Sequence, residues 1–222
     1  MTGNIVITGA NRGIGLAMTQ QYAAQGYTVY AVCRTASSEL NAISGVNIID
    51  GVDVVQDQDL QRLQTLLADI EINILINNAG ILSGDSLGNM DFSGIERQLQ
   101  VNAIGPLKVT DALLSRLTKG SKVALITSRM GSMSDNGSGG YYGYRMSKAA
   151  LNAAGVSLAQ DLKSHGIAVG LFHPGFVQTE MVNHSGDISA TEAASRLLQR
   201  IDELNINNTG SFRHSNGEDL PW

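Results

Sequence analysis

Short apolar runs alternate with longer amphipathic segments along most of this 222-residue chain. The apolar runs are rich in β-branched and aromatic residues, as buried strands are. They predict strands at 4–8, 27–33, 46–52, 72–77, 122–128 and 167–173, with a short one at 211–213. The amphipathic segments predict helices at 13–25, 57–69, 92–117, 141–164 and 189–204.

This alternation predicts an α/β fold with a doubly wound, mainly parallel sheet of the Rossmann type, in three α/β/α layers. Strands that are apolar almost throughout indicate a sheet that is covered on both faces. We find no repeat and no low-complexity linker, so residues 1–222 are expected to form one domain. Such sheets bind their ligands at the carboxyl ends of the strands.

The turn between the first strand and the first helix, VITGANRGIG, is rich in glycine. Glycine permits the tight turn and lets backbone approach a diphosphate, while the helix N-terminus offers unpaired N–H groups to the anion. The motif therefore predicts a dinucleotide site, although a glycine-rich connection without a ligand is the alternative. The contacts expected from this turn are Gly9, Asn11, Arg12, Gly13, Ile14 and Gly15.

The second strand ends in CRT, at the place where an acidic residue would bind the ribose hydroxyls of NAD. Arg34 stands there instead, Arg12 lies in the glycine turn, and the nearest acid, Glu39, falls several residues later. Two guanidinium groups suit a 2′-phosphate because their forked donors match its oxygens. The sequence therefore predicts NADP(H) in preference to NAD(H), unless Arg34 is only a solvated surface charge.

Three further strand ends favour the same ligand. A carboxylate after the third strand could accept from the adenine amino group, and Asp53 is the first candidate with Asp50 as its competitor. In NNAG (77–80) small residues leave room for the cofactor, and the asparagine amides can tie strands together. In HPG (173–175) a turn is fixed, and Thr179 is placed to bond a nicotinamide amide. The contacts expected here are Asp53, Val54, Asn78, Ala79, Gly80, Pro174, Gly175, Val177 and Thr179.

The stretch YYGYRMSK contains three tyrosines. A phenol has an ordinary pKa of about 10, which a cation a few ångströms away lowers. On a helix, neighbouring side chains are three or four residues apart. Tyr142 would then face an uncharged methionine, whereas Tyr141 would face Arg145 and Tyr144 would face Lys148. Spacing alone leaves Tyr141 and Tyr144 as candidates for a reactive phenol.

The motifs TGxxxGxG, NNAG, a serine ending the fifth strand, YxxxK and PG occur in this order between residues 8 and 179. This ordered set resembles the short-chain dehydrogenase/reductase family. The resemblance implies that Tyr144, four residues before Lys148, is the active tyrosine. It also implies that Asn102 holds a water in a proton relay, that Ser128 bonds the substrate carbonyl, and that Lys148 binds the nicotinamide ribose and acidifies Tyr144. Taken alone, each of these residues could serve a structural role instead.

Ser128 and Tyr144 are 16 residues apart (144 − 128), a few more than in many members of the family. This spacing and the ending GSFRHSNGEDLPW resemble a carbonyl-reductase-like branch that includes the sniffer and C-factor proteins. The resemblance implies an NADPH-dependent oxidoreductase (EC 1.1.1.-) that reduces an aldehyde or ketone. Because the branch has members associated with signalling, a dinucleotide-binding regulator with little or no turnover is the alternative. Epimerase or dehydratase chemistry fits the same residues, but the chain leaves little room for a sugar-nucleotide domain.

Composition narrows the expected partners. The formal net charge of −5 argues against nucleic acid or an anionic membrane surface, and no apolar stretch approaches the roughly 18 residues of a membrane span. Cys33 is the single cysteine, so no intrachain disulfide can form. Because the chain has neither paired thiols nor clustered histidines, no metal site is expected. Because the first residues lack a signal-peptide pattern, a cytoplasmic location is expected.

The segment 180–188 is expected to form a short lid over an open substrate pocket, where His184 could face the substrate or the solvent. His173, at the end of a buried strand, is expected to be structural. A small carbonyl or alcohol is the expected partner. The two long predicted helices could also pair copies of the chain into a homodimer or homotetramer.

Overall fold

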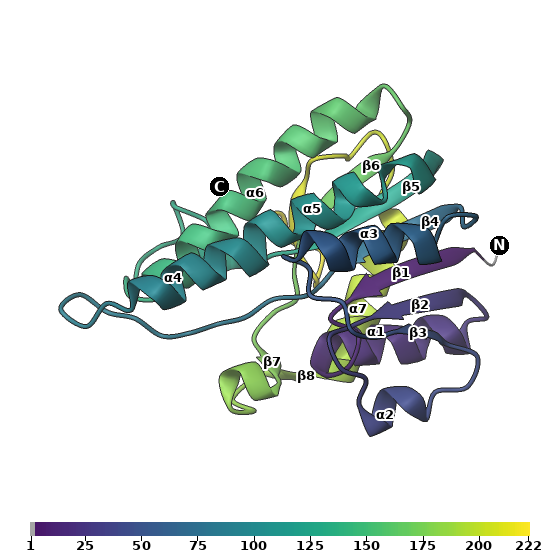
Figure 1. The fold of residues 1–222 in the computed structure, drawn as a ribbon. Coiled ribbons are helices and arrows are strands. Elements are labelled where there is room, and N and C mark those ends of the chain that lie inside the picture. Colours follow the sequence, from purple (N-terminus) through teal and green to yellow (C-terminus); the bar gives the residue numbers. More distant parts are fainter. Residues whose placement is uncertain (1–2) are drawn as a thin grey trace.

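Seven parallel strands form the central sheet of the computed structural model, which describes residues 3–222 (Figure 1). The strands are β1 (Asn4–Thr8), β2 (Thr28–Val32), β3 (Asn47–Ile49), β4 (Ile72–Asn77), β5 (Leu117–Ile126), β6 (Ala168–His173) and β9 (Phe212–His214). Their order across the sheet is β3-β2-β1-β4-β5-β6-β9. Successive strands therefore run outward from β1 to one edge and then from β4 to the other, which places a ligand crevice between β1 and β4.

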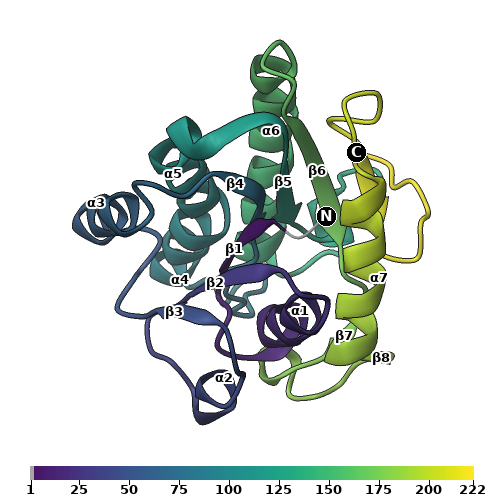
Figure 2. The same ribbon diagram turned by 90° about the vertical axis from the view of Figure 1, so that its right-hand side faces the viewer.

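Helices cover both faces of this sheet (Figure 2). They are α1 (Gly13–Ala24), α2 (Ser38–Asn41), α3 (Asp57–Leu66), α4 (Phe92–Leu99), α5 (Gly105–Ala112), α6 (Tyr142–Lys163) and α7 (Ala190–Glu203). One apolar core lies beneath α3, α5 and α6, and a second lies between the sheet and the pair α1 and α7. The predicted doubly wound, three-layer architecture is confirmed. No helix within residues 3–222 has the length and apolar character needed to cross a membrane.

The single helix predicted at 92–117 is wrong. The structure replaces it with α4, a π-helical turn at Gln100–Ile104, α5 and a 3₁₀ turn at Leu114–Arg116. Pro106 has no N–H, so it cannot donate to the carbonyl of Asn102 as an α-helix requires. β5 then begins five residues before the predicted start at 122, because Leu117 is buried in an extended segment rather than on a helix.

Two short strands, β7 (Val177–Gln178) and β8 (Ile188–Ser189), form a separate parallel pair. They flank the segment predicted as a lid and tie its two ends together. Neither these strands nor α2 was predicted, since elements of two to four residues carry no periodic pattern. The strand predicted at 211–213 is β9 within one residue, and it lies beside β6.

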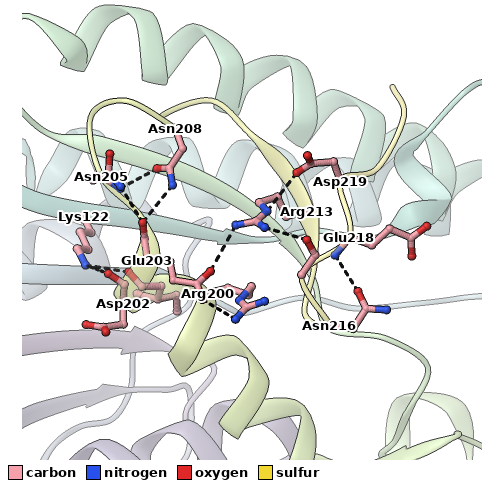
Figure 3. Close-up of polar contacts among 12 residues, drawn as sticks. Lys122, Arg200, Asp202, Glu203, Asn205, Asn208, Arg213, Asn216, Glu218 and Asp219 are labelled. Carbon is pink, nitrogen blue, oxygen red and sulfur yellow. Dashed lines mark hydrogen bonds and ion pairs between the residues drawn. The ribbon is translucent and has the colours of Figure 1, made fainter.

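A polar cluster holds the C-terminal segment against α7 and the sheet edge (Figure 3). The Arg200 guanidinium, which is almost buried, binds Glu203, and Arg213 donates to the carbonyl of Gly217 at 2.8 Å. Next to this cluster the Ser215 hydroxyl donates to the carbonyl of Pro174 at 2.8 Å. The C-terminal segment therefore supports the turn that follows β6.

Candidate functional site

A cleft of about 830 Å³ opens at the carboxyl ends of the strands, between the glycine turn and the lid segment. Most of the predicted cofactor contacts line it. Those that do are Gly9, Asn11, Arg12, Gly13, Ile14, Arg34, Asp53, Val54, Asn78, Ala79, Gly80, Tyr144, Lys148, Pro174 and Thr179. Three predicted contacts, Gly15, Gly175 and Val177, do not reach the lining. The cleft runs from the glycine turn to the tyrosine and lysine, so it spans both predicted halves of the site.

The backbone of the glycine turn packs so closely against its neighbours that side chains would not fit at two of its positions. Gly9 has a φ of 66°, and a Cβ there would stand 2.9 Å from the Cα of Ala79. A Cβ on Gly15 would stand 2.2 Å from the carbonyl oxygen of Gly9, so Gly15 acts by letting the helix approach the strand. The Asn78 amide donates to the carbonyls of Thr8 and Gly9 at 3.0 and 3.1 Å. Asn78 therefore ties β1 to β4, as the sequence predicted for these amides.

At the far end of the cleft, Asp53 lies in the loop after β3, which ends earlier than predicted. Its competitor Asp50 does not line the cleft. The Asp53 carboxylate already accepts from the Val55 amide at 3.2 Å and binds the Arg97 guanidinium at 3.1 Å. Arg97, on α4, also lines the cleft and was missed, because no sequence pattern links it to a loop 44 residues away.

The two arginines predicted to bind a 2′-phosphate lie on neighbouring segments. Asn11, next to Arg12, donates to the carbonyl of Thr35, next to Arg34, at 3.1 Å. Arg34 is exposed, and within residues 3–222 its guanidinium has no ion-pair partner. Arg12 instead binds Glu180 across the cleft, with both side chains 61% exposed. Only Arg34 is thus available without a competing carboxylate.

The structure separates the two candidate tyrosines. Tyr141 precedes α6 in a left-handed conformation, so the helical spacing to Arg145 does not apply. The Arg145 guanidinium instead donates to Gly140 and Ser138. Tyr144 lies on α6 beneath Lys148, whose Nζ is 5.7 Å from the centre of the ring, and both side chains are buried. Tyr144 is the phenol placed next to a cation.

Close contacts fix the first turns of α6. A Cβ on Gly143 would stand 3.0 Å from the Cα of Ile95 on α4. A Cβ on Gly131, just after β5, would stand 2.7 Å from the carbonyl carbon of Lys148. The helix is therefore clamped on two sides at Tyr144 and Lys148, which limits how far either side chain can move.

Burial governs the charges of these two residues. Burial raises the pKa of Tyr144 to about 12, although the hydrogen bond with the Ser128 side chain lowers it in part. It also lowers the pKa of Lys148 to about 8, and the lysine Nζ donates to the carbonyl of Ile126 at 2.9 Å. The lowered tyrosine pKa expected from a nearby cation is therefore absent from the protein alone, because desolvation raises the pKa and only the hydrogen bond with Ser128 opposes it. At neutral pH the phenol carries its proton and the lysine carries its charge.

Ser128 follows β5, which ends two residues before the predicted boundary at 128. Its side chain is buried, and its hydroxyl accepts from the Met130 amide at 3.1 Å while also interacting with Tyr144. It does not reach the cleft lining, unlike Tyr144. Ser128 thus combines the structural role of a turn cap with a place beside the phenol.

The Asn102 side chain lies behind the cleft in the π-helical turn. It binds both backbone groups of Ile81 at 2.8 Å and donates to the Ser147 hydroxyl at 3.0 Å. Both amide hydrogens are therefore committed. Pro106 has no N–H, so the main-chain carbonyl of Asn102 lacks the donor that an α-helix would supply four residues on.

The lid segment begins with a 3₁₀ turn at Glu180–Val182 and contains two residues with positive φ, Asn183 and His184. His184 is exposed to solvent and also lines the cleft, so the structure does not separate the two alternatives of facing the solvent and facing the substrate. His173 is buried against His214, with ring centres 4.8 Å apart, and burial lowers its pKa to about 3. It is neutral and packed, as the sequence predicted.

The chain is similar in sequence to known dehydrogenases and to a protein named C-signal. The family described as short chain dehydrogenase matches residues 3–190. The 1-hydroxy-2-glutathionyl-2-methyl-3-butene dehydrogenase of Rhodococcus sp. strain AD45 is 36% identical, over 98% of this chain and 99% of its own. The C-signal protein of Myxococcus xanthus is 44% identical over 68% of this chain and 93% of its own.

Solved structures agree with the carbonyl-reductase-like branch. An NADPH-bound carbonyl reductase from chicken fatty liver superposes with a TM-score of 0.91 at 26% identity, over 100% of this chain and 99% of that one. The carbonyl reductase Sniffer of D. melanogaster gives 0.91 at 27% identity, over 100% of both chains. From its fold, its ordered motifs and these relatives, the chain belongs to the short-chain dehydrogenase family of oxidoreductases.

Proposed function

We propose that this protein is an NADPH-dependent reductase of aldehydes or ketones, with Tyr144 as the proton donor. The observation that carries this proposal is the buried pair of Tyr144 and Lys148 at the wall of a cleft that begins at the glycine turn. The phenol is protonated at neutral pH, as a donor must be. Ser128, which lies beside the phenol, would donate to the same carbonyl oxygen and help to stabilise negative charge there.

The cleft has the features that a dinucleotide needs. The close backbone approach at Gly9 and the N-terminus of α1 suit a diphosphate. The Thr179 side chain lies against the same turn, 3.3 Å from where a Cβ on Gly13 would stand. Arg34 supports a preference for NADP(H), because its free guanidinium could bind a 2′-phosphate. A structural relative at 26% identity is described as NADPH-bound, which supports the same choice.

NADPH, when bound, supplies a hydride to the carbonyl carbon. The Tyr144 hydroxyl would donate its proton to the carbonyl oxygen, and the Ser128 hydroxyl would hold that oxygen by a hydrogen bond. Lys148 would bind the nicotinamide ribose and stabilise the phenolate that remains. A water on the main-chain carbonyl of Asn102 would then return a proton to Tyr144.

The direct test is NADPH consumption by the purified protein with a panel of aldehydes, ketones, quinones and diketones, and with NADH in parallel. The panel should include glutathionyl-substituted carbonyls, since a relative matching 98% of the chain is named for a glutathionyl alcohol. Turnover with NADPH above NADH is expected. NADPH binding without turnover on any compound would count against the reductase.

Arg34→Ala is expected to weaken NADPH binding roughly 10- to 100-fold and to leave NADH binding unchanged. A charge-assisted hydrogen bond contributes about 1.5–3 kcal/mol, and only NADPH carries the 2′-phosphate. Titration of intrinsic fluorescence with each dinucleotide measures both dissociation constants. Equal weakening of both would show that Arg34 does not read the phosphate.

The Arg12–Glu180 pair provides a matched variant, for which the expected change in NADPH affinity has the opposite sign to that of Arg34→Ala. Glu180 forms an ion pair with Arg12, so a 2′-phosphate would have to compete with this carboxylate for the guanidinium. An exposed ion pair contributes at most about 1 kcal/mol, so Glu180→Gln should tighten NADPH binding about two- to fivefold without changing NADH. If Glu180→Gln weakens NADPH binding, the carboxylate supports the cofactor rather than competing with it.

The pH profile of carbonyl reduction is expected to fall on the alkaline side near pH 8. Lys148, with a pKa of about 8, is charged below this pH and neutral above it, whereas Tyr144 keeps its proton up to about pH 12. Measuring kcat/KM from pH 6 to 10 tests this, because that ratio reports the free enzyme. A kcat/KM that stays constant up to pH 10 would show that the charge on Lys148 is not needed for the reaction.

The second candidate function is a dinucleotide-binding regulator that needs occupancy rather than turnover. The 44% identity to C-signal favours it. The complete set of Ser128, Tyr144 and Lys148 argues against it, because binding alone requires no acid. A Tyr144→Phe protein that binds NADPH, fails to turn over and still complements a deletion strain would establish the regulator.

A further inference from the structure

The catalytic helix begins without a cap of its own. Tyr141, at the N-cap position of α6, has φ 51° and ψ 42° and contributes no side-chain hydrogen bond to the helix. The two preceding residues, Gly139 and Gly140, also have positive φ. The first N–H groups of a helix have no partner within it, so this partly buried helix start takes its acceptors from elsewhere. The side chain of Tyr144 projects from this first turn.

Asp85, from the loop between β4 and α4, supplies those acceptors. Its Oδ1 accepts from the amide of Tyr142, its Oδ2 accepts from the amide of Gly143 at 3.0 Å, and its main-chain oxygen accepts from the amide of Tyr141 at 3.0 Å. The residue is only 8% exposed. A carboxylate at a helix N-terminus is favoured both by charge-assisted hydrogen bonds and by the helix dipole.

The segment that carries Asp85 is itself fixed at the site. Asn102 binds both backbone groups of Ile81 at 2.8 Å, and the Gln98 side chain accepts from the Ser83 amide at 3.1 Å. This segment therefore connects the end of β4, where the cofactor is expected, to the start of α6. One carboxylate completes that connection.

We propose that Asp85 is a positioning residue, which holds the first turn of α6 so that the Tyr144 hydroxyl stays at the reacting carbonyl. The inference rests on the proposed reductase function. A left-handed conformation is strained for a residue such as Tyr141 and persists only where surrounding contacts impose it. Without the Asp85 carboxylate, the turn that ends at Tyr144 loses two of its three external acceptors and is free to shift. A displacement of about 1 Å at a reacting group can cost roughly 100-fold in rate.

The matched control is the cap of a helix that carries no cleft residue. The Ser189 hydroxyl caps α7 by accepting from the Glu192 amide at 3.1 Å, and α7 contributes nothing to the cleft lining. Ser189→Ala should therefore lower the melting temperature by about 2–4 °C, as removal of a cap does, without affecting turnover. It separates loss of a cap in general from loss of this one.

The experiment compares Asp85→Ala, Asp85→Asn and Ser189→Ala for kcat, KM, NADPH affinity and melting temperature. Asp85→Ala is expected to lower kcat roughly 10- to 100-fold with NADPH affinity changed less than threefold. Asp85→Asn keeps one acceptor oxygen and should recover part of that loss; it also serves if Asp85→Ala does not fold. Ser189→Ala should keep kcat within twofold. A kcat within twofold of wild type for both Asp85 variants would overturn the proposal.

Hydrogen exchange gives a readout that does not need turnover. In Asp85→Asn the amides of 141–144 should exchange at least tenfold faster than in the wild type, while those of α7 are unchanged. If the wild-type protein turns over no carbonyl but this difference appears, the reductase proposal fails and the role of Asp85 in holding the turn stands. If the exchange of 141–144 is unchanged, Asp85 does not position the helix.

Discussion

Replacing Tyr144 with phenylalanine is expected to reduce carbonyl turnover by roughly 10²- to 10⁴-fold, while NADPH affinity changes less than about threefold. The substitution removes the proton but keeps a ring of the same shape in a buried position beside Lys148. Single-turnover oxidation of bound NADPH measures the chemical step, and fluorescence titration measures binding. A loss confined to the chemical step is the signature of a proton donor.

Two neighbouring tyrosines provide controls for this variant. Tyr141 and Tyr142 are 45% and 37% exposed, and neither lines the cleft. Tyr141→Phe and Tyr142→Phe should keep turnover within about threefold of wild type. An inactive Tyr141→Phe beside an active Tyr144→Phe would reverse the assignment, and equal loss of binding and turnover in Tyr144→Phe would remove its chemical role.

Replacing Lys148 with methionine is expected to abolish turnover and to stabilise the protein at pH 7 by about 1–2 kcal/mol. Burial lowers the pKa of Lys148 from 10.5 to about 8, so keeping the charge in the folded state opposes folding at neutral pH by up to about 3 kcal/mol. The lost hydrogen bond to the carbonyl of Ile126 offsets about 1 kcal/mol of the gain. A site that stores such a cost is more useful for chemistry than for stability.

The sign of the pH effect provides the check. Between about pH 8 and 10.5 the unfolded chain binds a proton at Lys148 that the folded protein does not, so wild-type stability gains from this group as pH rises through that window. The advantage of Lys148→Met should therefore shrink from pH 7 to pH 10 in urea unfolding. Lys163→Met, an exposed lysine on the same helix, controls for charge removal. A Lys148→Met protein that is less stable at pH 7 would mark the lysine as structural.

The sequence predicted the parts of the site that lie next to one another along the chain. The glycine turn, the NNAG segment and the Tyr144–Lys148 pair each occupy a few residues at a strand end or on one helical turn, so local spacing defines them. It could not predict contacts between distant segments. Glu180 meets Arg12 across 168 positions, and Asp85 meets Tyr142 across 57, with no pattern to connect either pair.

Two errors of sequence interpretation have physical causes. The helix predicted at 92–117 ran through to Leu117, although Pro106 lacks the N–H that an unbroken α-helix needs and the chain is extended from residue 117. The pKa of Tyr144 was expected to fall because a cation is near, but burial raises it in the protein alone. The extent of burial depends on the whole fold, which spacing along one helix does not report.

The transfer of deuterium from NADPH labelled at the reactive ring carbon tests the central claim most directly. The label should be followed by mass spectrometry of the alcohol that forms from a carbonyl identified in the panel. The reductase account predicts one deuterium on the carbinol carbon, from whichever ring face is used, and none in reactions of Tyr144→Phe. Product alcohol without deuterium from either labelled face, or bound NADPH that is never oxidised, would contradict it.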